Sequence, residues 1–314
     1  MTRVVVVTGA SSGIGLATAR AFARQGAQLV LAARSVESLA VAERLCKADG
    51  GEVLVVPTDV TKADQVDELL EATERRFGRV DVVVHAAAVL AYGRFEDVPG
   101  DIFNQVITTN VQGTANVGRS SLRRFQQHRS GTLIVVGSLL GKIATPYLSS
   151  YVTSKWAVHG LTRCWQIEVR SVPGVEVALV WPGSVDTPAY LQAANYAGRA
   201  GRPPPPVDRP EKVARRIMRL ADRPSRSASV GVANQLTVFG FRRLPAIFDR
   251  IVTPLMKAGG LSRDEISPHP GNVMEPSPAG DSEHGRWGRH WLRPIAGTAI
   301  AAGAVAVGWK AVRR

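Results

Sequence analysis

Tyr151 and Lys155 are two polar side chains suited to acid-base chemistry, and they stand four residues apart in a helical pattern that begins near Ser149. Residues at this spacing share one face of a helix, so both side chains can act on the same ligand. A phenol with a pKa of about 10 is a poor catalyst at neutral pH unless a nearby positive charge favours the phenolate. Lys155 supplies that charge, and the pair predicts proton transfer at Tyr151.

Ser138 is a second candidate for the same site. It closes an apolar run at residues 131–138, thirteen residues before Tyr151. Its hydroxyl can hold a substrate oxygen while Tyr151 delivers a proton to that oxygen.

A glycine-rich stretch, TGASSGIG at residues 8–15, follows the apolar run at 4–7 and precedes a helical pattern. The free N–H groups and the dipole of a helix N-terminus favour an anion such as a pyrophosphate. Gly9 allows the tight turn, Gly13 lets phosphates approach the backbone, and Gly15 lets the helix pack against the strand. The alternative is a turn without a ligand, which the preceding buried strand disfavours.

The elements that must position these residues alternate between short apolar runs and helical patterns as far as residue 232. This alternation predicts an α/β protein with a Rossmann-type, doubly wound parallel sheet of about seven strands, whose ligands bind beyond the carboxyl ends of the strands. The expected strands are 3–8, 28–33, 52–57, 80–86, 131–138, 175–181 and 229–232. The expected helices are 14–25, 36–48, 62–77, 101–128, 149–171 and 209–220, with an amphipathic stretch at 236–256.

The glycine-rich loop and the tyrosine-lysine pair together resemble the short-chain dehydrogenase/reductase family over residues 3–232. The resemblance implies an oxidoreductase that interconverts a carbonyl and an alcohol with a nicotinamide cofactor. It implies a catalytic tetrad of Asn110, Ser138, Tyr151 and Lys155, in which Asn110 supports a water linked to the lysine. The loop residues implied to bind the cofactor are Gly9, Ser11, Ser12, Gly13, Ile14 and Gly15.

Arg34 stands at the tip of the second strand, where the adenosine ribose is expected. Ala33 offers no acid there, and the guanidinium of Arg34 suits a phosphate, so we expect NADPH rather than NADH. The alternative is a solvated arginine at a helix start. Asp59 and Val60 are similar to the family's adenine-binding pair, although Asp59 can also be an N-cap.

The fourth strand departs from the family pattern, because His85 stands where an asparagine is usual. We interpret His85 as structural rather than as a base. Ala86 and Ala87 are small enough for the chain to pass close to the cofactor. The segment WPGSVDT at 181–187 resembles the family's nicotinamide-binding segment and implies roles for Pro182, Gly183, Val185 and Thr187.

The 314-residue chain carries a net charge of +13, and much of the excess lies near its end. Six basic residues in 285–314 flank an apolar stretch at 295–307, with tryptophans near its edges, which is typical of a bilayer interface. Thirteen helical residues reach about 20 Å, short of a hydrocarbon core of about 30 Å. The alternatives are a membrane-surface anchor and a packed helix or subunit contact. Nucleic acid is disfavoured because no stacking aromatics alternate with the charges.

The predicted organisation is a catalytic domain at 1–258 with a substrate loop at 188–209, a linker at 259–285 rich in Pro, Gly and Ser, and a basic apolar tail at 286–314. The apolar, proline-rich substrate region favours a lipophilic small molecule. Scattered histidines predict no metal site. Two distant cysteines, Cys46 and Cys164, fit a reducing, cytoplasmic compartment, and a homo-oligomer is expected.

Two other classes of function compete with the enzyme. A cofactor-binding sensor or scaffold would keep the fold and do little chemistry, and the departure at His85 is its best support. A membrane-tethered interaction module would depend chiefly on the tail. The intact tetrad favours the oxidoreductase.

Overall fold

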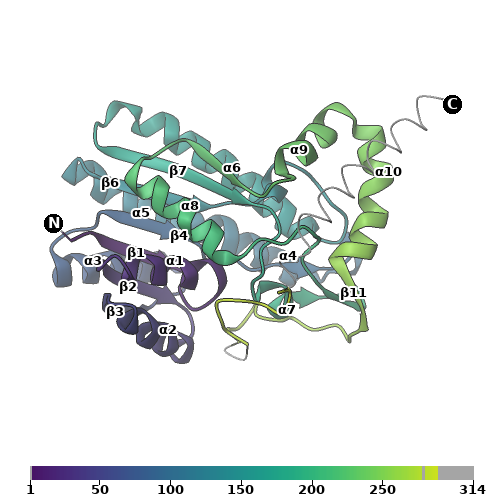
Figure 1. Ribbon diagram of the computed structural model, residues 1–314, viewed down its shortest axis with the longest axis horizontal. Helices are drawn as coiled ribbons and strands as arrows, with labels where there is room; N and C mark the ends of the chain where they lie inside the picture. The colour runs from purple at the N-terminus through teal and green to yellow at the C-terminus, as the bar shows by residue number, and fades with distance from the viewer. Residues whose placement is uncertain (1, 278–279, 289–314) are drawn as a thin grey trace.

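A seven-stranded parallel sheet forms the centre of the protein, in a computed structural model that describes residues 2–277 and 280–288 (Figure 1). The strand order is β10-β7-β6-β4-β1-β2-β3, which reverses between β1 and β4 and confirms the doubly wound sheet. The strands are apolar along their length because helices cover both faces. Their bounds are β1 Val4–Thr8, β2 Gln28–Ala33, β3 Glu52–Pro57, β4 Val82–His85, β6 Gly131–Val136, β7 Val175–Pro182 and β10 Ser227–Val230.

Two helical layers sandwich the sheet. On one face, α1 Gly13–Ala23, α2 Val36–Ala48 and α8 Pro210–Asp222 bury Leu16, Leu39 and Ile217. On the other, α3 Ala63–Phe77, α5 Gly113–His128 and α6 Ser149–Glu168 bury Leu69, Phe125 and Trp165. Short 3₁₀ turns occur at η1 Phe95–Asp97, η3 Leu139–Gly141 and η4 Val169–Ser171.

The single helix expected at 101–128 is interrupted. The structure has α4 Gly100–Ile107, a π-helical turn η2 Thr108–Gln112 and then α5. The wider turn contains Asn110, whose side chain is hydrogen-bonded to the loop after β4, and π turns are frequent at functional sites. Periodicity alone does not reveal this one-turn change.

The amphipathic stretch at 236–256 forms two helices, α9 Asn234–Arg243 and α10 Pro245–Leu255. Pro245 disfavours a helical backbone at Leu244, which adopts φ −130° and ψ 51°. The two helices stand beyond the sheet in Figure 1. Phe241 joins them to each other and to α6, with its ring 5.2 Å from Phe248 and 6.3 Å from Trp156.

The expected substrate loop at 188–209 contains short elements tied to other parts of the chain. These are α7 Ala189–Gln192, β8 Ala194–Asn195 and β9 Arg199–Gly201. Strand β8 pairs with β5 Ala91–Tyr92, and β9 pairs with β11 Leu261–Glu265, which follows the π turn η5 Met256–Gly260. Part of the expected linker therefore forms a strand against the substrate loop.

Several large apolar side chains of α9 and α10 are exposed to solvent, among them Leu236 (57%), Phe239 (55%) and Leu255 (56%). Within residues 2–277 and 280–288, none of the helices combines the length and hydropathy needed to cross a bilayer. The apolar stretch at 295–307 lies outside the described residues.

Candidate active site

Tyr151, Lys155 and Ser138 meet at the carboxyl edge of the sheet. Tyr151 and Lys155 lie one turn apart on α6, and the Lys155 ammonium nitrogen is 5.5 Å from the centre of the Tyr151 ring. Lys155 is buried, and its Nζ donates to the carbonyl of Val136 at the end of β6, 3.0 Å away. Ser138 follows β6 and is hydrogen-bonded to Tyr151. The side chains predicted to share one ligand are therefore adjacent.

Burial dominates the electrostatics of this group. It raises the pKa of the Tyr151 phenol well above its ordinary value, with a further rise from Tyr190, and the hydrogen bond with Ser138 opposes that rise. Burial also lowers the pKa of Lys155 to about 8. At neutral pH the phenol keeps its proton and the amine is charged, so the group can donate a proton and stabilise the phenolate that results.

Asn110 connects the loop after β4 to α6. Its Nδ2 donates to the carbonyl of Val89 at 2.8 Å and to the Ser154 hydroxyl at 2.9 Å, and its Oδ1 accepts from the Val89 N–H at 2.9 Å. The amide thereby fixes the backbone beside Tyr151. Its part in a water relay stays a prediction.

His159 is a residue of the site that sequence reasoning missed. The Ser138 N–H donates to its Nε2 at 3.3 Å, and its ring fills the space beside Gly141, where a Cβ would lie 2.5 Å from the ring. Burial lowers its pKa to about 3, so the ring is neutral and Nε2 can accept. Tyr151, Lys155 and His159 recur every four residues on one face of α6, a spacing that offered a signal for it.

The glycine-rich loop packs as closely as predicted. Gly9 has φ +68°, and a Cβ there would lie 2.7 Å from the Ala87 backbone nitrogen. A Cβ on Gly15 would lie 1.9 Å from the Gly9 carbonyl oxygen, so only glycine allows α1 to begin this near the loop. The loop thus touches the segment after β4 that contains Ala86 and Ala87.

Gly13 has φ +50° and opens α1 beside Thr187, where a Cβ would lie 3.0 Å from the threonine methyl group. Ser12 is the N-cap residue, in an extended conformation after Ser11. The first turn of α1 contains Ile14 and no acidic residue, so its positive end suits an anion.

The end of β7 lies next to this loop. The N–H of Gly183, which follows Pro182, donates to the Val230 carbonyl at 2.9 Å, and Val185 forms a bridge with Asp208. With Thr187 beside Gly13, the expected nicotinamide segment and the expected pyrophosphate loop lie against each other.

Arg34 follows β2, which is the neighbour of β1 in the sheet. It is partly buried, which lowers its pKa, while the charge of Asp59 opposes that shift. The Asp59 carboxylate accepts from the N–H of Thr61 at 2.9 Å and closes a turn before α3. Val60 is buried, and its Cγ2 would lie 2.7 Å from a Cβ on Gly113.

His85 joins three elements. Its Nδ1 is 2.8 Å from the Thr8 hydroxyl and its Nε2 is 2.9 Å from the Thr114 hydroxyl. Burial, assisted by the charge of Lys155, lowers its pKa to about 3. These contacts give the imidazole a structural role between β1, β4 and α5.

An apolar wall borders Tyr151. The buried members of this cluster are Tyr92, Leu148, Ala193, Met256 and Leu261, and Tyr190 and Val252 pack against them. Tyr92 is fully buried and Tyr190 packs beside it, and neither was singled out from the sequence. Val252 belongs to α10. This helix therefore lies between the apolar wall and the apolar side chains that α10 exposes to solvent.

Residues 272–277 and 280–288 form a segment, here called the strap, that returns from β11 toward α1 and α2 (Figure 1). The composition of this region predicted a linker, and the structure gives it contacts with the catalytic domain. The domain boundary at residue 258 stays a prediction. In the strap, Glu283 and His284 lie within 4.8 Å of Glu211, a set that resembles metal ligands. Glu283 pairs with Arg20 and His284 with Glu211, which accounts for their proximity.

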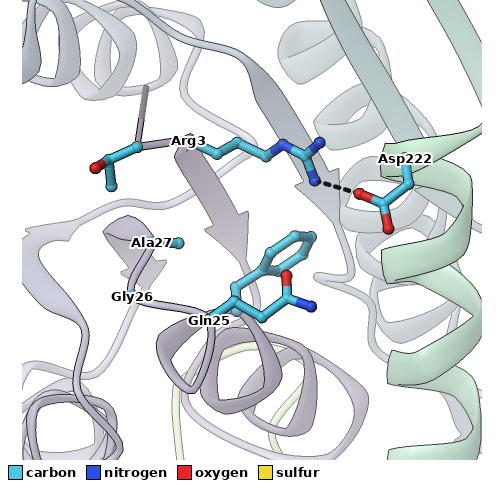
Figure 2. A pocket seen from close by; sticks show the side chains of 7 residues that line it. Arg3, Gln25, Gly26, Ala27 and Asp222 are labelled. Carbon is cyan, nitrogen blue, oxygen red and sulfur yellow. Dashed lines mark hydrogen bonds and ion pairs between the residues drawn. The ribbon is translucent and has the colours of Figure 1, made fainter.

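A surface hollow of about 530 Å³ lies at the opposite edge of the sheet, where β1 begins (Figure 2). It surrounds the ion pair between Arg3 and Asp222, whose atoms are 2.8 Å apart. Its lining lacks the residues of the candidate site, and we assign it no role.

Comparisons with known proteins show the family of the chain. The short chain dehydrogenase family matches residues 3–195. An uncharacterized oxidoreductase of Bacillus subtilis (strain 168), YxnA, is 31% identical, and the match covers 99% of this chain and 91% of that protein.

Solved structures show the same fold. An alcohol dehydrogenase from the archaeon Thermococcus sibiricus, complexed with 5-hydroxy-NADP, is 33% identical with a TM-score of 0.63, covering 73% of this chain and 95% of that one. A short-chain type dehydrogenase/reductase from Mycobacterium marinum is 25% identical with a TM-score of 0.65, covering 74% and 95%. This chain belongs to the short-chain dehydrogenase family of oxidoreductases.

Proposed function

We propose that this protein is an NADPH-dependent oxidoreductase that interconverts a carbonyl and an alcohol on a lipophilic substrate, with Tyr151 as the general acid and base. The observation that carries the proposal is the contact of Tyr151 with both Ser138 and Lys155 at the carboxyl edge of the sheet. Each of these side chains alone has a structural explanation, but their convergence beside a glycine loop is what hydride-transfer chemistry requires.

The expected cofactor-binding residues fit a dinucleotide. Glycine is needed at positions 9 and 15 because the loop packs closely against Ala87 and against its own backbone, and it turns there directly into α1. The α1 N-terminus suits the pyrophosphate, and Arg34 suits a 2′-phosphate. The relative from Thermococcus sibiricus was solved with an NADP derivative, which supports the same preference.

When bound, NADPH supplies the hydride. In reduction, the Ser138 hydroxyl holds the substrate oxygen and Tyr151 gives its proton to that oxygen as negative charge develops there. The Lys155 ammonium then stabilises the phenolate. In oxidation, the same phenolate accepts the proton from the alcohol.

The apolar wall and the exposed helices favour a lipophilic substrate met at a membrane surface. Leu236, Phe239 and Leu255 are exposed on α9 and α10, and four exposed cations accompany them with one acid. The cations are Arg242, Arg243, Arg250 and Lys257, and the acid is Asp249. This combination suits an interface with anionic lipids.

The sensor or scaffold remains a second candidate because His85 replaces the family's asparagine. Its contacts with Thr8 and Thr114 explain His85 without a loss of catalysis, so we favour the enzyme.

The deciding experiment measures NADPH and NADH oxidation over a panel of aldehydes and ketones, including long-chain and polycyclic ones, with Tyr151→Phe alongside. We expect the variant to lose about 10²- to 10⁴-fold in kcat, because the proton donor is gone. Its Kd for NADPH, measured by fluorescence, stays within about twofold of the wild type.

The matched control is Tyr196→Phe, which removes a phenol from a separate apolar cluster. A wild type that binds NADPH and turns over no carbonyl would favour the sensor. Equal turnover by Tyr151→Phe would refute the role of the tyrosine.

A further inference from the structure

The strap contacts the expected cofactor-binding segments at three successive places. The Arg34 guanidinium donates to the carbonyls of Asn272 at 2.6 Å and Met274 at 3.3 Å. The Gly13 N–H donates to the Ser282 carbonyl at 2.9 Å. Farther along, the N–H groups of residues 285 and 287 donate to the carbonyl and carboxylate oxygens of Asp186, at 3.3 and 3.1 Å.

Side-chain anchors hold the strap on the catalytic domain. Glu283 is 9% exposed and forms an ion pair with Arg20 of α1 at 2.6 Å, within a cluster that includes Asp49. Asp281 accepts from the Gln192 amide of α7 at 2.6 Å. An ion pair with so little solvent contact is screened less than a surface pair, so the Arg20 anchor is the stronger kind.

The partners that the strap gives Arg34 are neutral. Two carbonyls orient the guanidinium fork without cancelling its charge, whereas a carboxylate in their place would neutralise it. A fixed, unneutralised guanidinium binds a phosphate with less loss of side-chain entropy than a free one.

The strap also brings an unused donor close to Thr187. The Trp287 indole N–H is buried and has no hydrogen-bond partner among the residues that the structure describes. Trp287 lies beside Gly285, whose own Cβ would be 2.7 Å from the Thr187 carbonyl. A buried donor without a partner costs free energy, which a polar group of a bound cofactor would recover.

We infer that the strap is the outer wall of the cofactor site and determines the preference for the 2′-phosphorylated cofactor by fixing Arg34. The inference rests on the proposed cofactor-binding function. It assigns selectivity to residues near the end of the chain, outside the sheet and its crossover helices.

The test is a full-length variant in which two of the side-chain anchors are removed, Asp281→Ala with Glu283→Ala. With fewer anchors the strap fixes Arg34 less firmly, so the Kd for NADPH rises about tenfold while the Kd for NADH changes less than about threefold. Both constants are measured by fluorescence titration. Amide hydrogen exchange in the strap, followed without cofactor, becomes faster in the variant.

The matched control is Glu275→Ala, which removes an exposed carboxylate from the strap away from these anchors. It removes one negative charge from the strap without removing an anchor, and it leaves both the exchange and the ratio of the two constants unchanged. A double variant with faster exchange and an unchanged ratio, or with unchanged exchange, would overturn the proposal. A wild type without preference for NADPH would instead show that the cofactor assignment itself fails.

Discussion

His159 lies beneath Ser138 and holds the backbone from which the serine hydroxyl projects. The 3.3 Å contact from the Ser138 N–H to Nε2 requires an acceptor, and the pKa of about 3 keeps that nitrogen unprotonated throughout the neutral range. Its hydrogen bond is to the Ser138 backbone, so we treat it as a positioning residue.

Removing the acceptor should disturb the orientation of Ser138. We expect His159→Leu to lower kcat about tenfold, equivalent to about 1.4 kcal/mol of transition-state stabilisation. His159→Gln supplies an amide oxygen in place of Nε2 and should keep kcat within about threefold. Kd for NADPH is unchanged in both. Equal losses in the two variants would mean that ring packing, and not the hydrogen bond, supports the site.

His85 links the stability of the fold to pH. Its pKa is about 3 in the folded protein and about 6.5 in the unfolded chain, so the unfolded state binds one more proton between these values. Stability is therefore lost as pH falls from about 6.5 toward 3, by up to about 1.4 kcal/mol per pH unit for this group.

His85→Asn should reduce that slope, as measured by denaturant unfolding at a series of pH values. The residue His159 contributes in the same window, so part of the slope remains. Gln127→Asn, an exposed position on α5 without an ionisable side chain, serves as the control and should leave the slope unaltered. An identical pH dependence in His85→Asn and wild type would contradict the burial argument.

At the scale of elements, α1 is fixed against the loop that precedes it. The 1.9 Å separation between a Cβ at Gly15 and the Gly9 carbonyl oxygen leaves no room for a methyl group. Gly15→Ala should displace the helix, weaken NADPH binding at least tenfold and destabilise the fold by about 1–3 kcal/mol.

The comparison for this prediction is Gly160→Ala on α6, where a Cβ meets nothing within 4 Å. That variant should gain up to about 1 kcal/mol from helix propensity. Thermal and denaturant unfolding measure both effects. Unaltered NADPH affinity in Gly15→Ala would show that the loop does not need this approach.

The sequence pattern predicted helices, strands and site residues well wherever a single physical cause, such as burial or helical spacing, determined them. The run of valines in β1 and the spacing of Tyr151 and Lys155 required only burial and helical geometry. The π turn around Asn110 and the ring of His159 under Ser138 depend on tertiary contacts that a single stretch does not encode. The contacts of the strap were not predicted for a related reason. Pro, Gly and Ser are typical of linkers, and many of the hydrogen bonds that hold the strap involve its backbone.

At the scale of the whole molecule, apolar and basic side chains gather on α9 and α10. We predict that the full-length protein sediments with vesicles of phosphatidylcholine and phosphatidylglycerol, and less with phosphatidylcholine alone. Leu236→Asp with Phe239→Asp should reduce that binding about tenfold or more, because two apolar side chains are lost to charge. Added salt should weaken the part of the vesicle binding that is due to the cations.

Val41→Asp provides the control, since Val41 is an exposed apolar residue on α2. If Leu236→Asp with Phe239→Asp sediments with vesicles as much as this control does, the lipid-binding surface lies elsewhere in the chain. A shift in oligomeric state on mutation, with no change in sedimentation, would identify the surface as a subunit contact.

The ion pair between Arg20 and Glu283 joins residues 263 positions apart. On a ribosome that adds about 5–20 residues per second, roughly ten to fifty seconds separate the synthesis of the two partners. The first helix of the nascent protein therefore leaves the exit tunnel long before Glu283 has been synthesised. Until then, the Arg20 side chain and the outer side of the glycine loop are open to chaperones and to premature association.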